Sequence, residues 1–282
     1  MKIAYGTYAM PKHTLEDAIP ILANIGYDGV EICAGPRHVG SLPDAMTPSR
    51  RAAIRTLLAD HDMGVPATFA TALHVHETDD AKHAANFEFA RELNAVGRDF
   101  VPDREPCLAF GIGGRDYEWL KIRDSLAETG RKYGELAERE GFHLAIEAHS
   151  GAAVDRTSRA LWLIDQIGHD RVKLHFDMVH FFLAGETAEE AVPALVPITG
   201  HTHVTDARVH DDGSLDLLLL GQGELDTTGY VRAMHGAGWD DFITLEVSGM
   251  VWNKPAYLPV AAAEFAYATL DGAFREAGVP RG

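Results

Sequence analysis

The sequence predicts a closed barrel of eight parallel strands surrounded by helices, the (β/α)₈ fold. Short apolar segments alternate with longer amphipathic stretches along all 282 residues, a pattern typical of strand–helix units around a parallel sheet. Glycine follows the end of several amphipathic stretches, as expected where helices stop: Gly26, Gly64, Gly141, Gly168 and Gly238. Eight such units in a chain of this length favour the closed barrel; an open doubly wound sheet is the alternative. We expect residues 1–282 to form one domain.

The individual elements follow from apolar runs and helix-start signals. Thr14 and Asp17 form a capping pair at the start of the first helix, and Thr47-Pro48 opens the second with proline at the first helical position. Leu215–Leu220 is an apolar run that predicts an added hairpin or a subunit contact. Strands are expected at 2–8, 28–33, 65–70, 106–112, 142–148, 171–177, 198–204 and 241–247, and helices at 14–24, 47–62, 79–94, 116–140, 155–166, 187–195, 227–235 and 255–277.

Composition excludes several classes of partner. The chain has 25 Lys and Arg against 42 Asp and Glu, a formal net charge of −17, which repels polyanions, so we expect no nucleic-acid partner. Two cysteines form no disulfide framework and favour a reducing compartment. We find no run of about 18 apolar residues that would span a membrane and no signal-peptide core at the start. These observations predict a cytoplasmic homo-oligomer without a membrane partner.

Ionisable residues end four consecutive strands on the inward face. Side chains alternate across a strand, and Leu144 and Ile146 should pack on the helices, which turns Glu147 into the barrel. The same argument turns three further residues inward: Asp177, His203 and Glu246. All four lie at carboxyl ends of strands, where active sites of this fold are found.

Three carboxylates meeting at one point would repel each other, and a bound cation would remove that repulsion. Three carboxylates with one imidazole suit one divalent metal ion, Mn²⁺ foremost, with Mg²⁺, Co²⁺ or Zn²⁺ as alternatives. We expect His175 and His201 one layer below this site, where they would fill the core or orient the ligands.

The segments IEAH, FDMVH, HTHVTD, LGQGELD and TLEV, together with the opening GYDGVEI, resemble the xylose-isomerase-like TIM-barrel superfamily of sugar isomerases, ketose 3-epimerases and related lyases. The resemblance implies that Glu147, Asp177, His203 and Glu246 bind the metal and that Glu147 and Glu246 are also acid/base catalysts. It further implies that His180 and Arg208 contact substrate.

Three more residues are candidates for the site. His149 stands where ketose 3-epimerases of that group carry another motif, with a second glutamate, and we interpret it as catalytic or substrate-binding. His74 follows the third strand and could bind a substrate hydroxyl or, with His76, a second metal; we assign it to substrate binding. Glu31 ends the second strand facing inward, and we expect it to bind substrate or to make a buried polar contact. The loop Gly111–Arg115 is a weaker candidate for phosphate binding through its N–H groups.

We therefore expect a metal-dependent sugar isomerase or epimerase that removes a proton beside a carbonyl and forms an enediolate. The alternative enzyme is a metal-dependent lyase or dehydratase acting on an oxidised sugar or 3-oxo-glycoside, including cleavage of the C-glycoside deglycosidase kind. Endonuclease chemistry is disfavoured by the charge. A non-catalytic binding module would require a vacant or purely structural metal site.

Overall fold

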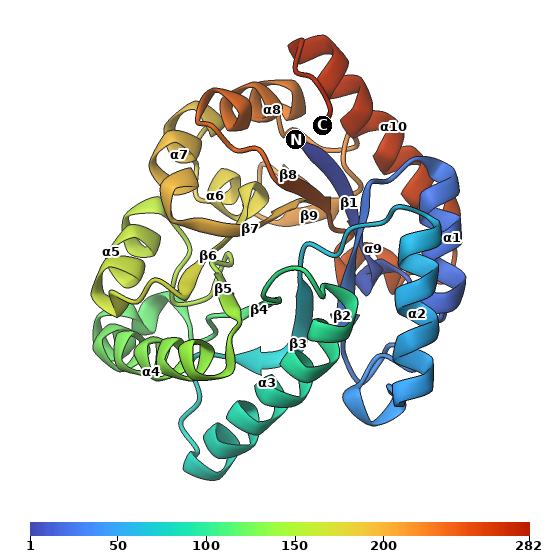
Figure 1. Ribbon diagram of the computed structural model, residues 1–282. Coiled ribbons are helices and arrows are strands. Elements are labelled where there is room, and N and C mark those ends of the chain that lie inside the picture. Colours follow the sequence, from blue (N-terminus) through green and yellow to red (C-terminus); the bar gives the residue numbers. More distant parts are fainter.

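The computed structural model describes residues 1–282 and shows eight parallel strands closed into a barrel (Figure 1). Strand β1 pairs with both β2 and β10, so the ring has no free edge and the open-sheet alternative is excluded. The barrel strands are β1 (Lys2–Gly6), β2 (Gly29–Ala34), β3 (Thr68–His74), β4 (Cys107–Gly111), β5 (His143–Glu147), β6 (Val172–Asp177), β7 (Thr199–Val204) and β10 (Phe242–Leu245).

Eight principal helices surround the barrel (Figure 1). The predicted capping pair Thr14–Asp17 and the proline at the start of the second helix are both present. No helix combines the length and the apolar character needed to cross a bilayer. These helices are α1 (Leu15–Ile25), α2 (Pro48–Asp60), α3 (Asp80–Phe100), α4 (Trp119–Glu140), α5 (Thr157–Ile167), α7 (Ala188–Leu195), α8 (Thr227–Gly236) and α10 (Pro259–Ala277).

Several predicted boundaries were displaced. The third helix continues to Phe100 rather than ending at residue 94, and the first strand ends at Gly6 rather than at residue 8. The third strand begins at Thr68 rather than at residue 65, because the chain before it joins the sheet only through a single bridge from Gly64 to Gly29. The last helix begins at Pro259 and not at Pro255, although both are prolines that would suit the first helical position. The intervening residues form turns at the mouth of the barrel.

Three short additions lie over the carboxyl ends of the strands: α6 (Met178–Leu183), the hairpin β8 (Asp206–Val209) with β9 (Leu215–Leu218), and α9 (Gly249–Trp252). The hairpin was one of the two predictions for the apolar run at 215–220. Asp206 anchors it, since its buried carboxylate accepts hydrogen bonds from the backbone N–H groups of Gly221, Gly223 and Leu225.

The apolar core lies mainly between the strands and the helices, in one large cluster that includes Leu144, Leu174 and Ile243. A much smaller cluster, Ala67, Phe69, Ala109 and Ala145, lies apart from it. By strand alternation Ala145 faces the barrel interior with Glu147. Small residues there leave room for the buried histidines and carboxylates that the same strands carry.

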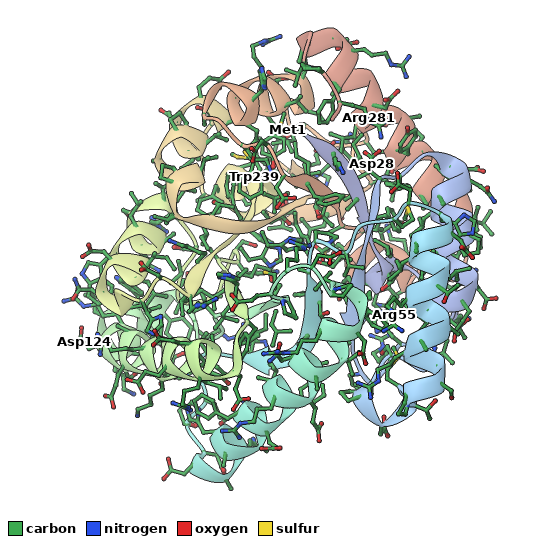
Figure 2. All side chains as sticks on the ribbon, in the orientation of Figure 1. Met1, Asp28, Arg55, Asp124, Trp239 and Arg281 are labelled. Atoms are coloured by element: carbon green, nitrogen blue, oxygen red, sulfur yellow. The ribbon has the colours of Figure 1, made fainter.

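The two ends of the chain meet beside β1. Asp28 Oδ2 accepts a hydrogen bond from the backbone N–H of Ile3 (2.8 Å) and another from Arg281 Nη2 (2.6 Å). Gly282 N–H also donates to the carbonyl of Met1. Figure 2 shows Asp28, Arg281 and Met1 grouped on one side of the molecule.

We expect Asp28→Ala to lower the free energy of unfolding by about 1–3 kcal/mol, because it leaves the N–H of Ile3 without its acceptor and removes one of the two carboxylates that pair with Arg281. Urea unfolding measures the change. The control is Asp124→Ala on the opposite rim (Figure 2), whose side chain is 84% exposed and whose loss should cost less than about 0.5 kcal/mol. Equal stability of the two variants would contradict the anchoring role.

Candidate metal centre and active site

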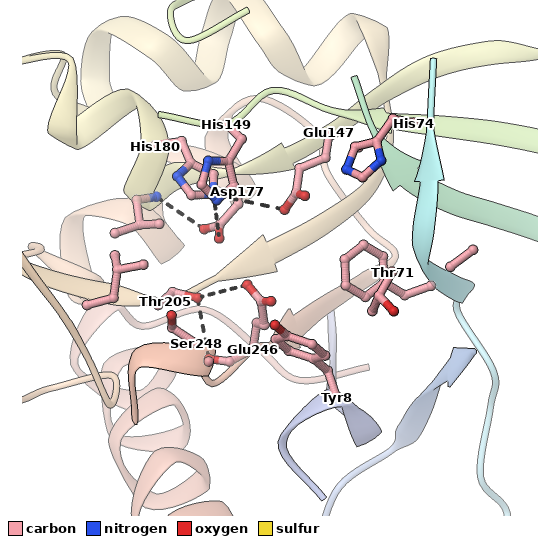
Figure 3. A pocket seen from close by; sticks show the side chains of 16 residues that line it. Tyr8, Thr71, His74, Glu147, His149, Asp177, His180, Thr205, Glu246 and Ser248 are labelled. Carbon is pink, nitrogen blue, oxygen red and sulfur yellow. Dashed lines mark hydrogen bonds and ion pairs between the residues drawn. The ribbon is translucent and has the colours of Figure 1, made fainter. Parts of the chain in front are cut away.

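Four side chains from four neighbouring strands meet at the mouth of the barrel. Figure 3 labels Glu147, Asp177 and Glu246 among them. Glu147 and Asp177 end β5 and β6, His203 lies near the end of β7, and Glu246 follows β10 directly. One potential ligand atom from each residue lies within 4.8 Å of the other three. The structure therefore brings together the four residues that the sequence proposed as metal ligands.

The unpaired atoms of this group fit a cation. Asp177 Oδ2 and His203 Nδ1 are buried and have no hydrogen-bond partner. Buried polar atoms of proteins are nearly always paired, so these two atoms need a partner of another kind. A divalent metal ion between Asp177, His203, Glu147 and Glu246 would pair both atoms, and the mixture of oxygen and nitrogen donors suits such an ion.

The carboxyl groups are electrostatically strained without a cation. Burial, followed by the charge of Glu246, raises the pKa of Asp177 from its ordinary value to about 7. The same two causes raise the pKa of Glu147 well above its usual range. Both shifts mean that the ionised forms are disfavoured here, and a bound cation would favour them again.

Glu31 fixes the ring of His203 from below. Glu31 Oε2 lies 2.7 Å from His203 Nε2 and 2.6 Å from His201 Nε2, and all three residues are buried. Burial opposes ionisation of Glu31, but the two imidazoles outweigh it and lower its pKa to about 2. The Nε2–H of His203 thus donates to a carboxylate, which leaves Nδ1 free to face Glu246 Oε2 at 3.5 Å.

His175 and His201 lie beside His203 in the same buried layer, with His175 and His203 ring centres 4.1 Å apart. Ring nitrogens of these three histidines also approach within 4.8 Å of one another. Two of the three already share Glu31 through Nε2, so we interpret this group as the support of the upper site. Burial, then the neighbouring His203 and His201, lowers the pKa of His175 well below its ordinary value.

The other histidines lie around the upper chamber. His180 Nε2 is 3.8 Å from Asp177 Oδ2 and 3.9 Å from Glu147 Oε1. Its ring lies against that of His149, with 3.8 Å between centres, and Ser150 Oγ lies 3.3 Å from its Nδ1. His74 lines the opposite wall, beside Glu147 (Figure 3).

Two residues assigned to substrate binding do not line the chamber. Arg208 is exposed, donates to the carbonyl of Gln222 at 2.9 Å and lies near Glu224. It shares one face of β8 with Asp206, and that face points to the turn at 221–225. Glu31 is fully buried beneath the candidate metal ligands and makes a polar contact with His201 and His203, the second of the two roles expected for it.

The sequence analysis did not name several residues that line the chamber: Tyr8, Phe69, Thr71, Thr205 and Ser248. Thr205 and Ser248 each follow a metal-ligand position by two residues, so strand alternation alone would have indicated them. Thr205 Oγ1 lies 3.4 Å from Glu246 Oε2. Tyr8 and Thr71 lie in or just beyond strand ends, the positions where this fold builds its active sites.

The stability of the metal-free protein tests whether ionised Asp177 is repelled by the neighbouring carboxyl groups. The pKa of Asp177 is raised on folding, so this group destabilises the folded state as pH rises from its unfolded value towards about 7. Asp177→Asn keeps an oxygen for the N–H of Val179 and removes the charge. In EDTA its melting temperature should exceed that of the wild type at pH 7.5, by a margin that shrinks as pH falls to 5.

Added Mn²⁺ should reverse this order, because only the wild type keeps the complete ligand set and binding stabilises the folded state. Asp124→Asn serves as the control and should follow the wild type under both conditions. A variant that melts below the wild type at pH 7.5 in EDTA would show that Asp177 is not under electrostatic strain.

Comparison with known proteins agrees with this geometry. The chain is 27% identical to the inosose isomerase of Bacillus velezensis, over 94% of this chain and 92% of that protein. It shares its fold with a crystal structure of the IOLI protein with a bound zinc atom (TM-score 0.77, 18% identity, 98% of each chain) and with L-ribulose 3-epimerase (TM-score 0.73, 19% identity, 98% and 97% of the chains). Residues 19–268 match the family described as xylose isomerase-like TIM barrel, and the chain belongs to that family.

Proposed function

We propose that the protein is a divalent-metal-dependent isomerase or epimerase that removes and returns a proton beside the carbonyl of a sugar or cyclic keto-polyol. One observation carries the proposal: Glu147 and Glu246 face each other across a chamber that Asp177 also lines (Figure 3), and a ring nitrogen of His203 lies within 4.8 Å of a carboxylate oxygen of each. Two carboxylates on opposite sides of one carbon can take a proton from one face and return it to the other.

The donor set described above would hold the metal ion, which supplies Lewis-acid polarisation of a carbonyl oxygen when bound. The protein itself supplies the proton transfers. Glu147 is buried at the end of β5 and lines the chamber, a fixed position from which its carboxylate can take a proton from a bound substrate and return it. Glu246 is less buried and is oriented by the hydroxyl of Thr205.

The size of the chamber limits what it can hold. Its volume is about 170 Å³, below the range of about 300–1,000 Å³ that is usual for ligand pockets, so it suits one sugar-sized ring. Polar side chains such as Thr71, Ser248 and His180 surround it. The relatives named for action on inosose and ribulose support a substrate with a ketone beside a hydroxyl-bearing carbon.

A second reaction is supported by the pair His149–His180. These rings lie in contact beside Glu147, and an imidazole is the side chain best suited to protonate a departing group near neutral pH. If the substrate carries a leaving group next to the carbon that loses its proton, proton removal beside the carbonyl would be followed by elimination of that group. This is the lyase or dehydratase alternative, including cleavage of a 3-oxo-glycoside.

The isomerase proposal predicts that Glu147→Gln and Glu246→Gln each lower kcat by about 10²-fold or more at saturating Mn²⁺, because each removes a positioned acid/base group. Solvent deuterium should appear in both epimers recovered with the wild type, whereas each variant should lose inversion and should lose exchange for the epimer whose proton faces the missing glutamate. Metal content is measured in parallel, since both residues are also proposed ligands. Glu128→Gln, on an exposed helix face, is the control; full activity in either site variant would remove that glutamate from proton transfer.

Replacement of His149 by alanine separates the two reactions. For an isomerase we expect KM to rise while kcat stays within about a few-fold, the signature of lost binding that is equal in ground and transition states. His143→Ala, at the start of the strand β5 that precedes His149, is the matched control. A large loss of kcat that shrinks with better leaving groups would instead identify the enzyme as a lyase.

A further inference from the structure

A second chamber opens directly from the metal chamber. It has a volume of about 550 Å³ and shares four lining residues with the first: His74, Gly111, Glu147 and His149. Glu147 and His149 therefore lie at the boundary between the two spaces. A ring held beside Glu147 and Glu246 would point any substituent on this side into the second chamber.

The walls of the second chamber are built into the fold. The loop Gly111–Arg115 is joined to the chain after β3 by hydrogen bonds from Val75 N–H and His76 N–H, and to the opposite wall by one from Ala153 N–H to the carbonyl of Gly113. Gly113 and Gly114 have φ of +77° and +70°, and a Cβ at Gly114 would lie 2.6 Å from Ile122 Cδ1. The loop is thus fixed in a conformation that requires glycine.

The chemistry of these walls is that of a site for hydroxyl groups. The backbone N–H groups of Gly113, Gly114 and Arg115 make no backbone hydrogen bond, and the chamber is also lined by the side chains of His76 and Arg115 as donors. Carboxylates of Glu118 and Glu147 line the same space as acceptors. Hydroxyls donate and accept and so match both kinds of group, whereas a phosphate would face two carboxylates in a chain of net charge −17.

We propose that the second chamber binds a polyol unit, such as another sugar ring, joined to the ring that the metal chamber holds. The substrate class is then glycosidic or otherwise extended, and the loop Gly111–Arg115 is its specificity site. This inference rests on the proposed function for the placement of the first ring.

The test compares D-fructose with four glucosylated fructoses that differ in linkage: turanose, maltulose, leucrose and isomaltulose. Isothermal titration of the Mn²⁺-loaded protein measures their dissociation constants. At least one disaccharide should bind about tenfold more tightly than fructose, as two or three added hydrogen bonds would produce. If no disaccharide binds more tightly than fructose, the proposal is overturned.

Variants that fill the chamber show where the added affinity arises. Ala152→Trp and, from the opposite wall, His76→Trp alter residues that line only the second chamber. Either should reduce disaccharide binding to the level of fructose while changing fructose binding by less than about twofold; Ala152→Ser is the matched control. Tight disaccharide binding that survives both tryptophans overturns the proposal.

Two further measurements distinguish a polyol site from an anion site and test the second chamber separately from the isomerase reaction. Fructose 6-phosphate that binds more tightly than every disaccharide, and loses this advantage in Arg115→Gln, would overturn a polyol site in favour of an anion site. Deuterium exchange from solvent tests the proposed function separately. Disaccharide binding that depends on the chamber without any exchange would support the second chamber and refute the isomerase reaction.

Discussion

The carboxylates of Glu147, Asp177 and Glu246 lie close together where water screens them poorly, and the arrangement around them follows from that repulsion. Each comes from a different strand, so the closed barrel holds them at a fixed separation that no single flexible segment could maintain. The raised pKa values of Glu147 and Asp177 reflect the same crowding. A divalent cation would convert this repulsion into attraction, which makes folding of the barrel mouth and metal binding parts of one equilibrium.

The layer beneath the ligands explains how a histidine can serve among carboxylates. His203 has two ring nitrogens, and a free ring could turn either towards the chamber. Glu31 removes this choice by accepting from Nε2, and its partner His201 holds Glu31 in place. Small side chains such as Ala109 and Ala145 elsewhere in the interior leave space for this network. The polar interior thus costs apolar contacts but orients His203, the one nitrogen donor among the proposed metal ligands.

The alternation of side chains was sufficient to predict which faces of β5, β6, β7 and β10 point inward. A shift of one residue would turn every side chain of a strand to the other face, and in β5 it would place Leu144 among the charged groups of the barrel interior. Contacts between distant strands were not predictable in this way. Glu31 reaches His203 across 172 positions of sequence, and no local pattern reports such a pair. Arg208 illustrates the same limit. Asp206 anchors the hairpin that carries Arg208 to the turn at 221–225, and this contact, which directs the Arg208 side chain to Gln222, cannot be read from the position of Arg208 in the sequence.

The residues proposed for proton transfer and those proposed for substrate selection come from different parts of the fold. Glu147 and Glu246 are fixed by barrel strands, whereas His149, Gly113 and Arg115 lie on loops that follow β5 and β4. Loops can change in length and sequence without disturbing the barrel, so a common proton-abstraction centre can serve isomerisation, epimerisation or elimination according to what the loops place beside it. In this chain the loop after β5 contributes His149 at the boundary of the two chambers, where its ring lies against that of His180 in α6, and the loop after β4 contributes a glycine-dependent wall. Under the proposed function, the side of the chamber that these loops form would decide the fate of the substrate after proton removal.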